Sequence, residues 1–535
     1  MKHFGVALAI ALVCAVSALA DEGQHHEDLT PQQVGTVHFP VSCSQAMQMP
    51  FNRGVALLHS FWYEEAQKEF EDIARQDPQC AMAYWGVAMS LWHQLWNHPD
   101  ESTIKNANPA LEKGKALKAK TARERDYIAA IGIFYAHSGK LDYQQRATAY
   151  SHAMERIYTK YPDDREAAAF YALSLLASEP DNDTSYVNRK KAAAVLEKLF
   201  DVEPDHPGVA HYLIHSYDKP ELASLGLPAA RRYAKIAPAA PHALHMPSHI
   251  FARLGLWQDD IDSNLASIAA TRKTAAMHMG GEGHQFHAMD FLVYAYLQTG
   301  RDDDARGVIA EVKAMPPMQD MYGMGYDEHI AALVALEAAY SLERHRWAEA
   351  AQLAPVEGAS LGDNSITYWA RGIGAVRSGD LTEAKKDLAE IESIHAKLVE
   401  QKKKSFADAV DKDRKEVLAW VEHGEGKDND AVATLRALAG KESGVSEVSD
   451  QVPASEMLAD MLLEMKRPDE ALRQYETDLK LNPNRLNGLH GAAQAAEQAG
   501  KASQASQYRA QLEKLCAGSQ SERCQLEPSH PATGQ

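Results

Sequence analysis

A spacing of 34 residues recurs along this chain of 535 residues and constrains its fold more than any other feature. Counted from Met47, Ala66 and Pro78 stand at positions 20 and 32 of one unit, and Ala471 and Pro483 stand at the same positions of a later unit. Such a period is typical of stacked helix pairs, because each pair buries its apolar face only against its neighbours. The sequence therefore predicts one continuous all-α solenoid rather than several compact domains.

Three segments carry a family resemblance: FNRGVALLHSFWYEEA, DPQCAMAYWGVAMSLW and PHALHMPSHIFARLGLW. Through them the chain resembles exported bacterial tetratricopeptide-repeat proteins over roughly residues 40–515. The resemblance implies a right-handed α-solenoid of tetratricopeptide-type helix–turn–helix repeats with a ligand-binding concave groove. It carries no particular activity, so function has to be argued from the residues.

The repeat pattern divides the chain along its length. We expect a signal peptide (1–20), a flexible N-terminal segment (21–42), N-terminal repeats (43–120), repeats with longer loops (121–204), histidine-rich repeats (205–313), further tetratricopeptide-like repeats (314–450), C-terminal repeats (451–515) and a C-terminal tail (516–535).

The first segment has the features of an export signal. Lys2 precedes an apolar run that starts at Phe4, and small residues stand at Ala18 and Ala20. This pattern predicts cleavage after Ala20, and the apolar run is too short for a favourable membrane anchor. No later segment is apolar enough to span a membrane, so we expect a periplasmic or secreted protein.

Export changes the interpretation of the cysteines. Of five cysteines, Cys14 leaves with the signal peptide, and an even number remains. In an oxidising compartment this favours two disulfides, which allow three pairings. Proximity in sequence favours Cys43 with Cys80 and Cys516 with Cys524, and free buried thiols are the alternative.

Histidine is unusually frequent, with 24 in the chain, and nine of them lie between His206 and His287. His211 and His215 are separated by four residues, and His245 and His249 repeat this spacing one period of 34 residues later. Residues four apart share one face of a helix. The two pairs therefore occupy equivalent positions on neighbouring helices.

In the resembled fold, positions 2, 5, 9, 12 and 13 of the first helix of each repeat line the concave groove. The resemblance thus implies that the two histidine pairs face one groove. Further residues fall on such positions: His59, His93, Trp85, Trp92, His242, Arg253, His287 and Asp290. Core packing explains part of the aromatic set equally well.

Imidazoles on adjacent helices are suitable ligands for zinc, copper or iron. We therefore expect a transition-metal site formed from His211, His215, His242, His245, His249 and His287, with Asp290 as an oxygen ligand or as an acceptor behind the ligands. Methionines recur at every third residue from Met315 to Met324, and thioethers favour copper. The alternative for these methionines is packing between repeats.

Three functions remain open at this point. The first is a solenoid that binds a protein, peptide or small molecule in its groove, with a histidine-lined metal centre. The second is a metal-dependent oxidase or hydrolase that uses the same histidines, and the third is a metal-free interaction scaffold. A net charge of −19 argues against nucleic-acid binding, because no basic surplus exists to displace phosphate counterions.

Overall fold

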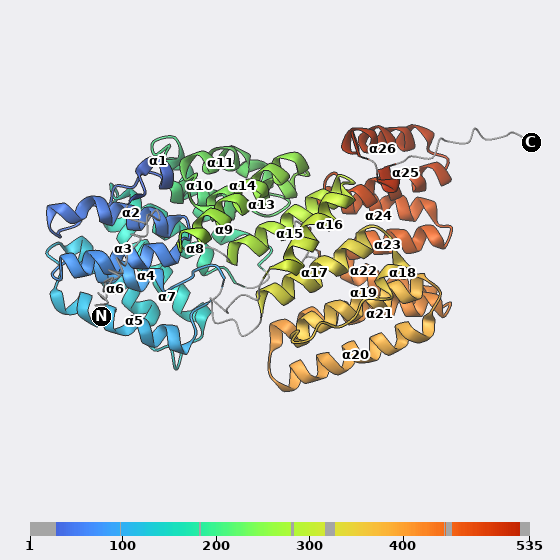
Figure 1. The fold of residues 1–535 in the computed structure, drawn as a ribbon, viewed down its shortest axis with the longest axis horizontal. Coiled ribbons are helices and arrows are strands. Elements are labelled where there is room, and N and C mark those ends of the chain that lie inside the picture. The colour runs from blue at the N-terminus through green and yellow to red at the C-terminus, as the bar shows by residue number, and fades with distance from the viewer. Residues whose placement is uncertain are drawn as a thin grey trace, which may run out of the picture.

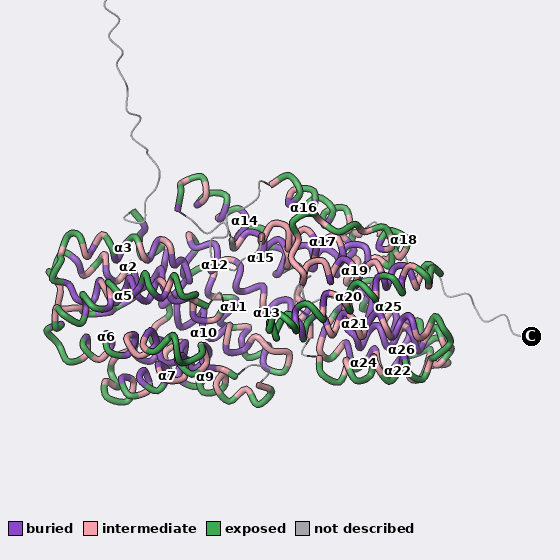
Figure 2. The backbone as a smooth tube through the Cα atoms, turned by 90° about the horizontal axis from the view of Figure 1, so that it is seen from below, coloured by how far each residue is buried: buried purple, intermediate pink, exposed green. Residues whose placement is uncertain are grey.

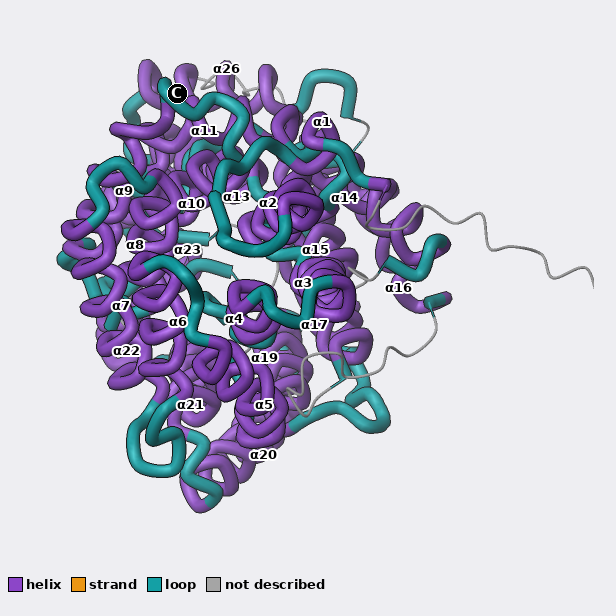
Figure 3. The backbone as a smooth tube through the Cα atoms, turned by 90° about the vertical axis from the view of Figure 1, so that its left-hand side faces the viewer, coloured by secondary structure: helices purple, strands orange, loops and turns teal. Residues whose placement is uncertain are grey.

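The computed structural model describes residues 28–96, 98–180, 183–279, 283–315, 327–442, 444–445, 452–519 and 521–524. Within these ranges the chain forms α-helices joined by loops, without a strand (Figure 1, Figure 3). The expected signal peptide and the methionines from Met318 to Met324 lie outside the described residues.

The helices of the N-terminal half are α1 (Pro31–Val34), α2 (Gln48–His59), α3 (Tyr63–Gln76), α4 (Ala81–Ser90), α5 (Glu101–Leu117), α6 (Ala122–Tyr135), α7 (Tyr143–Lys160), α8 (Arg165–Ala177), α9 (Val187–Phe200), α10 (Pro207–Tyr217), α11 (Ala223–Ile236), α12 (Pro241–His245), α13 (Pro247–Arg253) and α14 (Trp257–Ala276). Those of the C-terminal half are α15 (Gly283–Gln298), α16 (Asp302–Ala314), α17 (Glu328–Glu343), α18 (Trp347–Ala350), α19 (Leu361–Arg377), α20 (Leu381–Glu400), α21 (Lys404–Gly424), α22 (Asp428–Ala439), α23 (Ala454–Glu464), α24 (Pro468–Leu481), α25 (Leu486–Gln498) and α26 (Ala502–Leu515).

These helices are stacked as an array, in which nearly every helix packs against the next one in sequence. Buried apolar residues run through the inside of the array (Figure 2). One apolar core covers the helices up to α13, a second centres on α14 to α17, and a third continues to α26. The predicted all-α solenoid of helix–turn–helix repeats is thereby confirmed.

Close packing in the first repeats depends on two glycines. The ring of Phe70 on α3 is fully buried between Gly54 on α2 and Gly86 on α4. A Cβ atom added to Gly86 would lie 2.3 Å from the Phe70 ring, and one added to Gly54 would lie 2.9 Å from it. The repeat pattern therefore needs a residue without a side chain at these positions.

The superhelix brings the first repeat back against later ones, since α2 contacts α10 and α1 contacts α11. The segment before α2, residues 35–47, packs where the first repeat meets the later ones. Phe39 is fully buried among aromatic rings, and the amide of Thr36 donates to the carbonyl of Asp205 at 2.8 Å. Residues 28–42 thus pack as part of the fold, which corrects the expected flexible segment there.

The C-terminal repeats are fastened to the middle of the chain through a buried arginine. Arg485, at the start of α25, donates to Glu456 and Glu343 at 2.6 Å each and to the Tyr294 hydroxyl at 2.9 Å. Because a guanidinium needs several acceptors when it is buried, these contacts fix the orientation of α25 relative to α15, α17 and α23.

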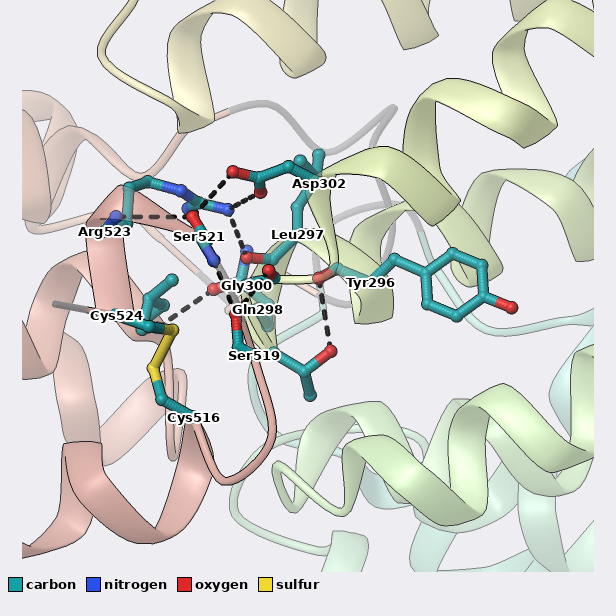
Figure 4. The surroundings of a disulfide bond; sticks show 12 residues. Tyr296, Leu297, Gln298, Gly300, Asp302, Cys516, Ser519, Ser521, Arg523 and Cys524 are labelled. Atoms are coloured by element: carbon teal, nitrogen blue, oxygen red, sulfur yellow. Dashed lines mark hydrogen bonds and ion pairs between the residues drawn. A yellow bond between two sulfur atoms is a disulfide. The ribbon is translucent and has the colours of Figure 1, made fainter.

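Both disulfides join the pairs that proximity favours, Cys43 with Cys80 and Cys516 with Cys524. The second one closes a short loop that docks on α15 and α16 (Figure 4). From this loop Arg523 donates to the carbonyl of Leu297 at 2.8 Å and to Asp302 at 2.5 Å. Residues 516–519 and 521–524 therefore belong to the packed structure, which corrects the expected tail at these positions.

We predict that Gly86→Ala lowers the thermal unfolding temperature, because the new methyl group overlaps the Phe70 ring. Overpacking of this kind costs about 1–3 kcal/mol. Gly307→Ala is the matched control, since Gly307 also lies within a helix and has no neighbour within 4 Å of the added Cβ. This control should be unchanged or more stable, and equal unfolding temperatures for Gly86→Ala and the wild type would contradict the packing argument.

Candidate metal centre

Histidines come together from three neighbouring parts of the array: α10, the consecutive helices α12 and α13, and α15. Helix α13 contacts both α10 and α15. The helices α10, α12, α13 and α15 carry, in this order, His211 and His215, His242 and His245, His249, and His284 and His287.

The repeat spacing predicts one helix through His245 and His249, but the helix is interrupted at Met246. Pro247 has no amide hydrogen to continue the helical hydrogen-bond series. Met246 nevertheless keeps right-handed helical angles (φ −51°, ψ −34°), so α12 and α13 follow one another closely. His245 and His249 therefore still meet, with Nε2 atoms 3.0 Å apart.

His211, His215 and His242 form what we call the first triad. The Nε2 atom of His211 lies 3.0 Å from Nε2 of His215 and 3.1 Å from Nε2 of His242. On its outer side, Nδ1 of His211 lies 2.6 Å from the carbonyl oxygen of His59. Since a carbonyl can only accept, Nδ1 of His211 carries a proton, and Nε2 of the neutral ring presents a lone pair to the other two rings.

Hydrogen bonding alone does not satisfy this arrangement. A single lone pair on His211 cannot accept from both neighbouring rings, and Nδ1 of His242 has no hydrogen-bond partner among the described residues. An additional proton is also unfavourable: burial lowers the pKa of His211 to about 3 and lowers the pKa values of His215 and His242 well below the usual range. Three convergent neutral imidazoles are suited to a metal ion.

His245, His249 and His287 form the second triad, in which the possible ligand atoms all lie within 4.8 Å of one another. Nδ1 of His245 lies 2.7 Å from Oδ1 of Asn264, whose amide nitrogen is already used as a donor to Asp260. This leaves Oδ1 of Asn264 as an acceptor and fixes the proton of His245 on Nδ1.

The same reasoning applies to His249. Its Nδ1 atom lies 3.0 Å from Oδ2 of Asp218, and Arg253 donates to the other oxygen of this carboxylate. Both outer nitrogens are therefore donors, and when both rings are neutral, two Nε2 lone pairs face each other across 3.0 Å. Two lone pairs at this distance repel unless a proton lies between them or a metal ion lies beside both of them. Outer acceptors of this kind are typical of metal-binding histidines.

A third group of possible ligands consists of His59, Glu166 and His206. Here every nitrogen has a complementary partner. Both Nε2 atoms donate to the Glu166 carboxylate, at 2.9 Å from His59 and 3.0 Å from His206. On the outer sides, the hydroxyl of Tyr212 donates to Nδ1 of His59, and the amide of Val209 donates to Nδ1 of His206. This group is a complete hydrogen-bond network in its own right.

Electrostatics agree with that description of the third group. Burial by itself raises the pKa of Glu166, but His206 and His59 outweigh it and hold this pKa well below the usual range. The pKa of His59 is lowered, mainly by burial. An ionised carboxylate between two donating imidazoles is thus the stable state, and it connects α2, α8 and the start of α10.

A cavity of about 1440 Å³ lies beside the two triads and reaches across to α21. His215, His249 and His287 contribute to its wall, together with Asp290. Aromatic and aliphatic side chains also line it, among them Trp96, Tyr143, Phe286, Ile366, Phe406 and Val410. A mixed wall of this kind fits an organic ligand with polar groups.

Other residues expected in the groove lie elsewhere. Trp85 and Trp92 are fully buried and pack against rings such as Phe170 and Phe134. Neither presents a surface to a ligand, which corrects the expected aromatic groove wall. The rings that cover these positions come from the N-terminal segment (Phe39) and from α6 and α7 (Tyr127 and Tyr150), so the positions belong to the core.

The remaining expected residues have specific neighbours. His59 is fully buried in the third group. His93 stacks on Tyr63 with ring centres 4.3 Å apart, and burial lowers its pKa to about 4. Arg253 contacts Asp218 at the second triad, and Asp290 lies at the cavity wall.

Four contributors were missed in the sequence: Asp218, Asn264, Glu166 and His206. Asp218 had a local signal, because it follows His215 by three residues. The other three meet the histidines only through the superhelix, so spacing along the chain gives no signal for them. His284, whose ring centre lies 4.7 Å from that of His242, was also missed, although it too had a local signal, because it precedes His287 by three residues.

No protein-family model matches this chain, and no curated protein matches it. Among solved structures, the human IFIT1 dimer with m7Gppp-AAAA is 13% identical, with a TM-score of 0.36 over 82% of this chain and 90% of that one. The Cut9–Hcn1 complex of the APC/C is 12% identical (TM-score 0.34; 85% and 77% covered), and the TPR domain of P58(IPK) is 14% identical (TM-score 0.20; 85% and 99% covered). Likenesses this distant say nothing about a ligand, and the class of the protein follows from its own helices: a tetratricopeptide-type solenoid with clustered histidines.

We predict that Glu166→Gln destabilises the protein by about 1–3 kcal/mol, because the amide can accept from only one of the two imidazoles and leaves a buried donor without an acceptor. The difference from wild type should shrink as pH falls below the ordinary glutamate value of 4.5, since a carboxyl whose pKa is lowered by folding loses its contribution there.

Unfolding curves at several pH values measure this effect. Glu155→Gln is the control, because Glu155 forms a half-exposed pair with Lys191, which contributes less than about 1 kcal/mol. Equal losses of stability in Glu166→Gln and Glu155→Gln would show that the third group stabilises the fold no more than an exposed ion pair does.

Proposed function

We propose that this protein is an exported tetratricopeptide-type solenoid that holds a transition metal between histidines of adjacent helices and binds a ligand in the neighbouring cavity. The observation that carries the proposal is the pair of facing Nε2 atoms of His245 and His249, 3.0 Å apart, with both Nδ1 protons fixed on outer acceptors. A metal ion resolves this repulsion, and the residues of both triads fit one.

The donor set favours zinc, copper or iron as the metal. Each triad supplies three neutral nitrogen ligands, and Asp290 lies close enough to line the same cavity as His287. Imidazole suits all three metals, whereas magnesium and calcium prefer oxygen donors. In this assignment Asp218 and Asn264 accept hydrogen bonds from the Nδ1 atoms of His249 and His245 and thereby orient the two rings toward the metal. The ligand in the groove is a protein, a peptide or a small molecule.

Export to the periplasm or beyond is part of the proposal. It is supported by the N-terminal signal pattern with cleavage after Ala20 and by the two disulfides, which persist in oxidising compartments. None of the helices described here is both long and apolar enough to cross a membrane. In domain terms, the histidine-rich repeats of residues 205–313 would form the functional segment.

A second candidate function is metal-dependent catalysis, as in an oxidase or a hydrolase. It is favoured by one observation: each triad has three histidines and a side that faces the 1440 Å³ cavity. Catalytic zinc sites also have three protein ligands and an open position. An exchangeable coordination position, detected by the binding of an added anion to the metal, would favour this function over a closed structural site.

Metal analysis of the protein purified without an affinity tag tests the proposal. We expect tightly held zinc, copper or iron, and a lower unfolding temperature after treatment with a chelator. Binding to the folded state stabilises it by about 2.7 kcal/mol when free metal is at 100 times the dissociation constant. The variants His211→Ala and His245→Ala should each hold less metal than wild type.

His152→Ala is the matched control, because His152 is an exposed histidine on α7 far from the triads in sequence. It should bind as much metal as wild type. Absence of metal after incubation with zinc, copper and iron salts would refute the proposal and leave the metal-free scaffold.

A further inference from the structure

The two triads are neighbours as well as repeats of one another. His242 of the first triad and His245 of the second lie on the same short helix, α12, with ring centres 6.2 Å apart. The rings of His215 and His249 are 6.3 Å apart. Because the pairs His211/His215 and His245/His249 are one repeat of 34 residues apart, the stacking of repeats has placed two similar nitrogen sites side by side.

Both triads are open on the same side. His211, His242 and His245 are buried, with at most 2% of each residue exposed. His215 of the first triad, and His249 and His287 of the second, contribute to the wall of the 1440 Å³ cavity. A molecule in this cavity can therefore approach both triads at once.

We infer that the first and second triads hold two metal ions as one paired centre, and that the two ions share a small anionic donor, such as hydroxide, on the cavity side. This inference rests on the proposed function. It goes further in that it fixes the number of ions, their proximity and the class of the shared ligand.

Charge balance is the physical reason for a shared anion. Six neutral imidazoles bring no negative charge to balance two divalent ions. Because ring centres of the two triads lie 6.2 and 6.3 Å apart, the two ions would be close to each other, and their like charges would repel strongly in a buried site. Asp218, behind the ligands, is already engaged by His249 and Arg253, and Asp290 at the cavity wall adds at most one negative charge. An anion between the ions lowers the repulsion, and the cavity gives it access.

The third group, His59, Glu166 and His206, does not extend the paired centre to a third ion. It is connected to the first triad by the bond from Nδ1 of His211 to the carbonyl of His59 and by the ring of Tyr212, which contacts both His59 and His211. Its own nitrogens are all used, because Glu166 lies between the two rings. We therefore expect two ions per chain and not three.

The test uses the full-length exported chain, freed of metal and titrated with Cu(II), with the copper content and the electron paramagnetic resonance spectrum measured at each step. We expect saturation at two ions per chain. The spectrum of the fully loaded protein should be broadened or diminished per copper ion, because the two spins interact. Azide added to this form should bind at one per pair of ions.

Variants assign the two ions. His215→Ala and His249→Ala should each hold one ion less and show the spectrum of an isolated copper ion, and His152→Ala should keep two interacting ions. The wild-type result does not depend on the folding of these variants, and circular dichroism checks that they remain helical.

The outcomes separate the two proposals. Two ions with independent spectra, a single ion per chain, or azide that binds once per ion or not at all would overturn the paired centre while leaving metal binding intact. No bound copper, zinc or iron would overturn both.

Discussion

The hydrogen bonds on the outer nitrogens of the triad histidines determine what this part of the molecule can bind. A carbonyl of α2, an amide of α14 and the carboxylate of Asp218 each take the Nδ1 proton of one ring. The Nε2 lone pairs then have to point inward, toward one another. Because the acceptors belong to different repeats, the histidines acquire this property only when the superhelix is assembled, and metal binding and folding are coupled.

The third group shows that clustered histidines alone do not define a metal site. His59 and His206 are as close to their neighbours as the triad histidines are, yet a carboxylate accepts from both of them and their other nitrogens accept from Tyr212 and Val209. Donors and acceptors match there without an ion. In the triads, acceptors hold the outer nitrogens of His211, His245 and His249, and the Nε2 atoms of these rings point inward. This difference separates a structural network from a site for a cation.

The sequence predicts the architecture well, because the 34-residue spacing of small, aromatic and proline residues follows directly from helix packing. It also predicts which histidines meet, since residues four apart and one repeat apart share a face. It does not predict that they divide into two triads, because His242 and His245, both on α12, contact different neighbours: His211 of α10 and His287 of α15, respectively. Nor does it predict the burial of Trp85 and Trp92, whose rings pack against Phe170 of α8 and Phe134 of α6.

Anomalous X-ray diffraction from crystals of the metal-loaded protein, recorded at the absorption edge of the bound metal, tests the central claim most directly. The account predicts one peak among the Nε2 atoms of His211, His215 and His242 and another among those of His245, His249 and His287. Each peak should lie about 2.0–2.1 Å from its nitrogens if the metal is zinc. A peak at His59, Glu166 and His206, or no peak at either triad, would contradict the account.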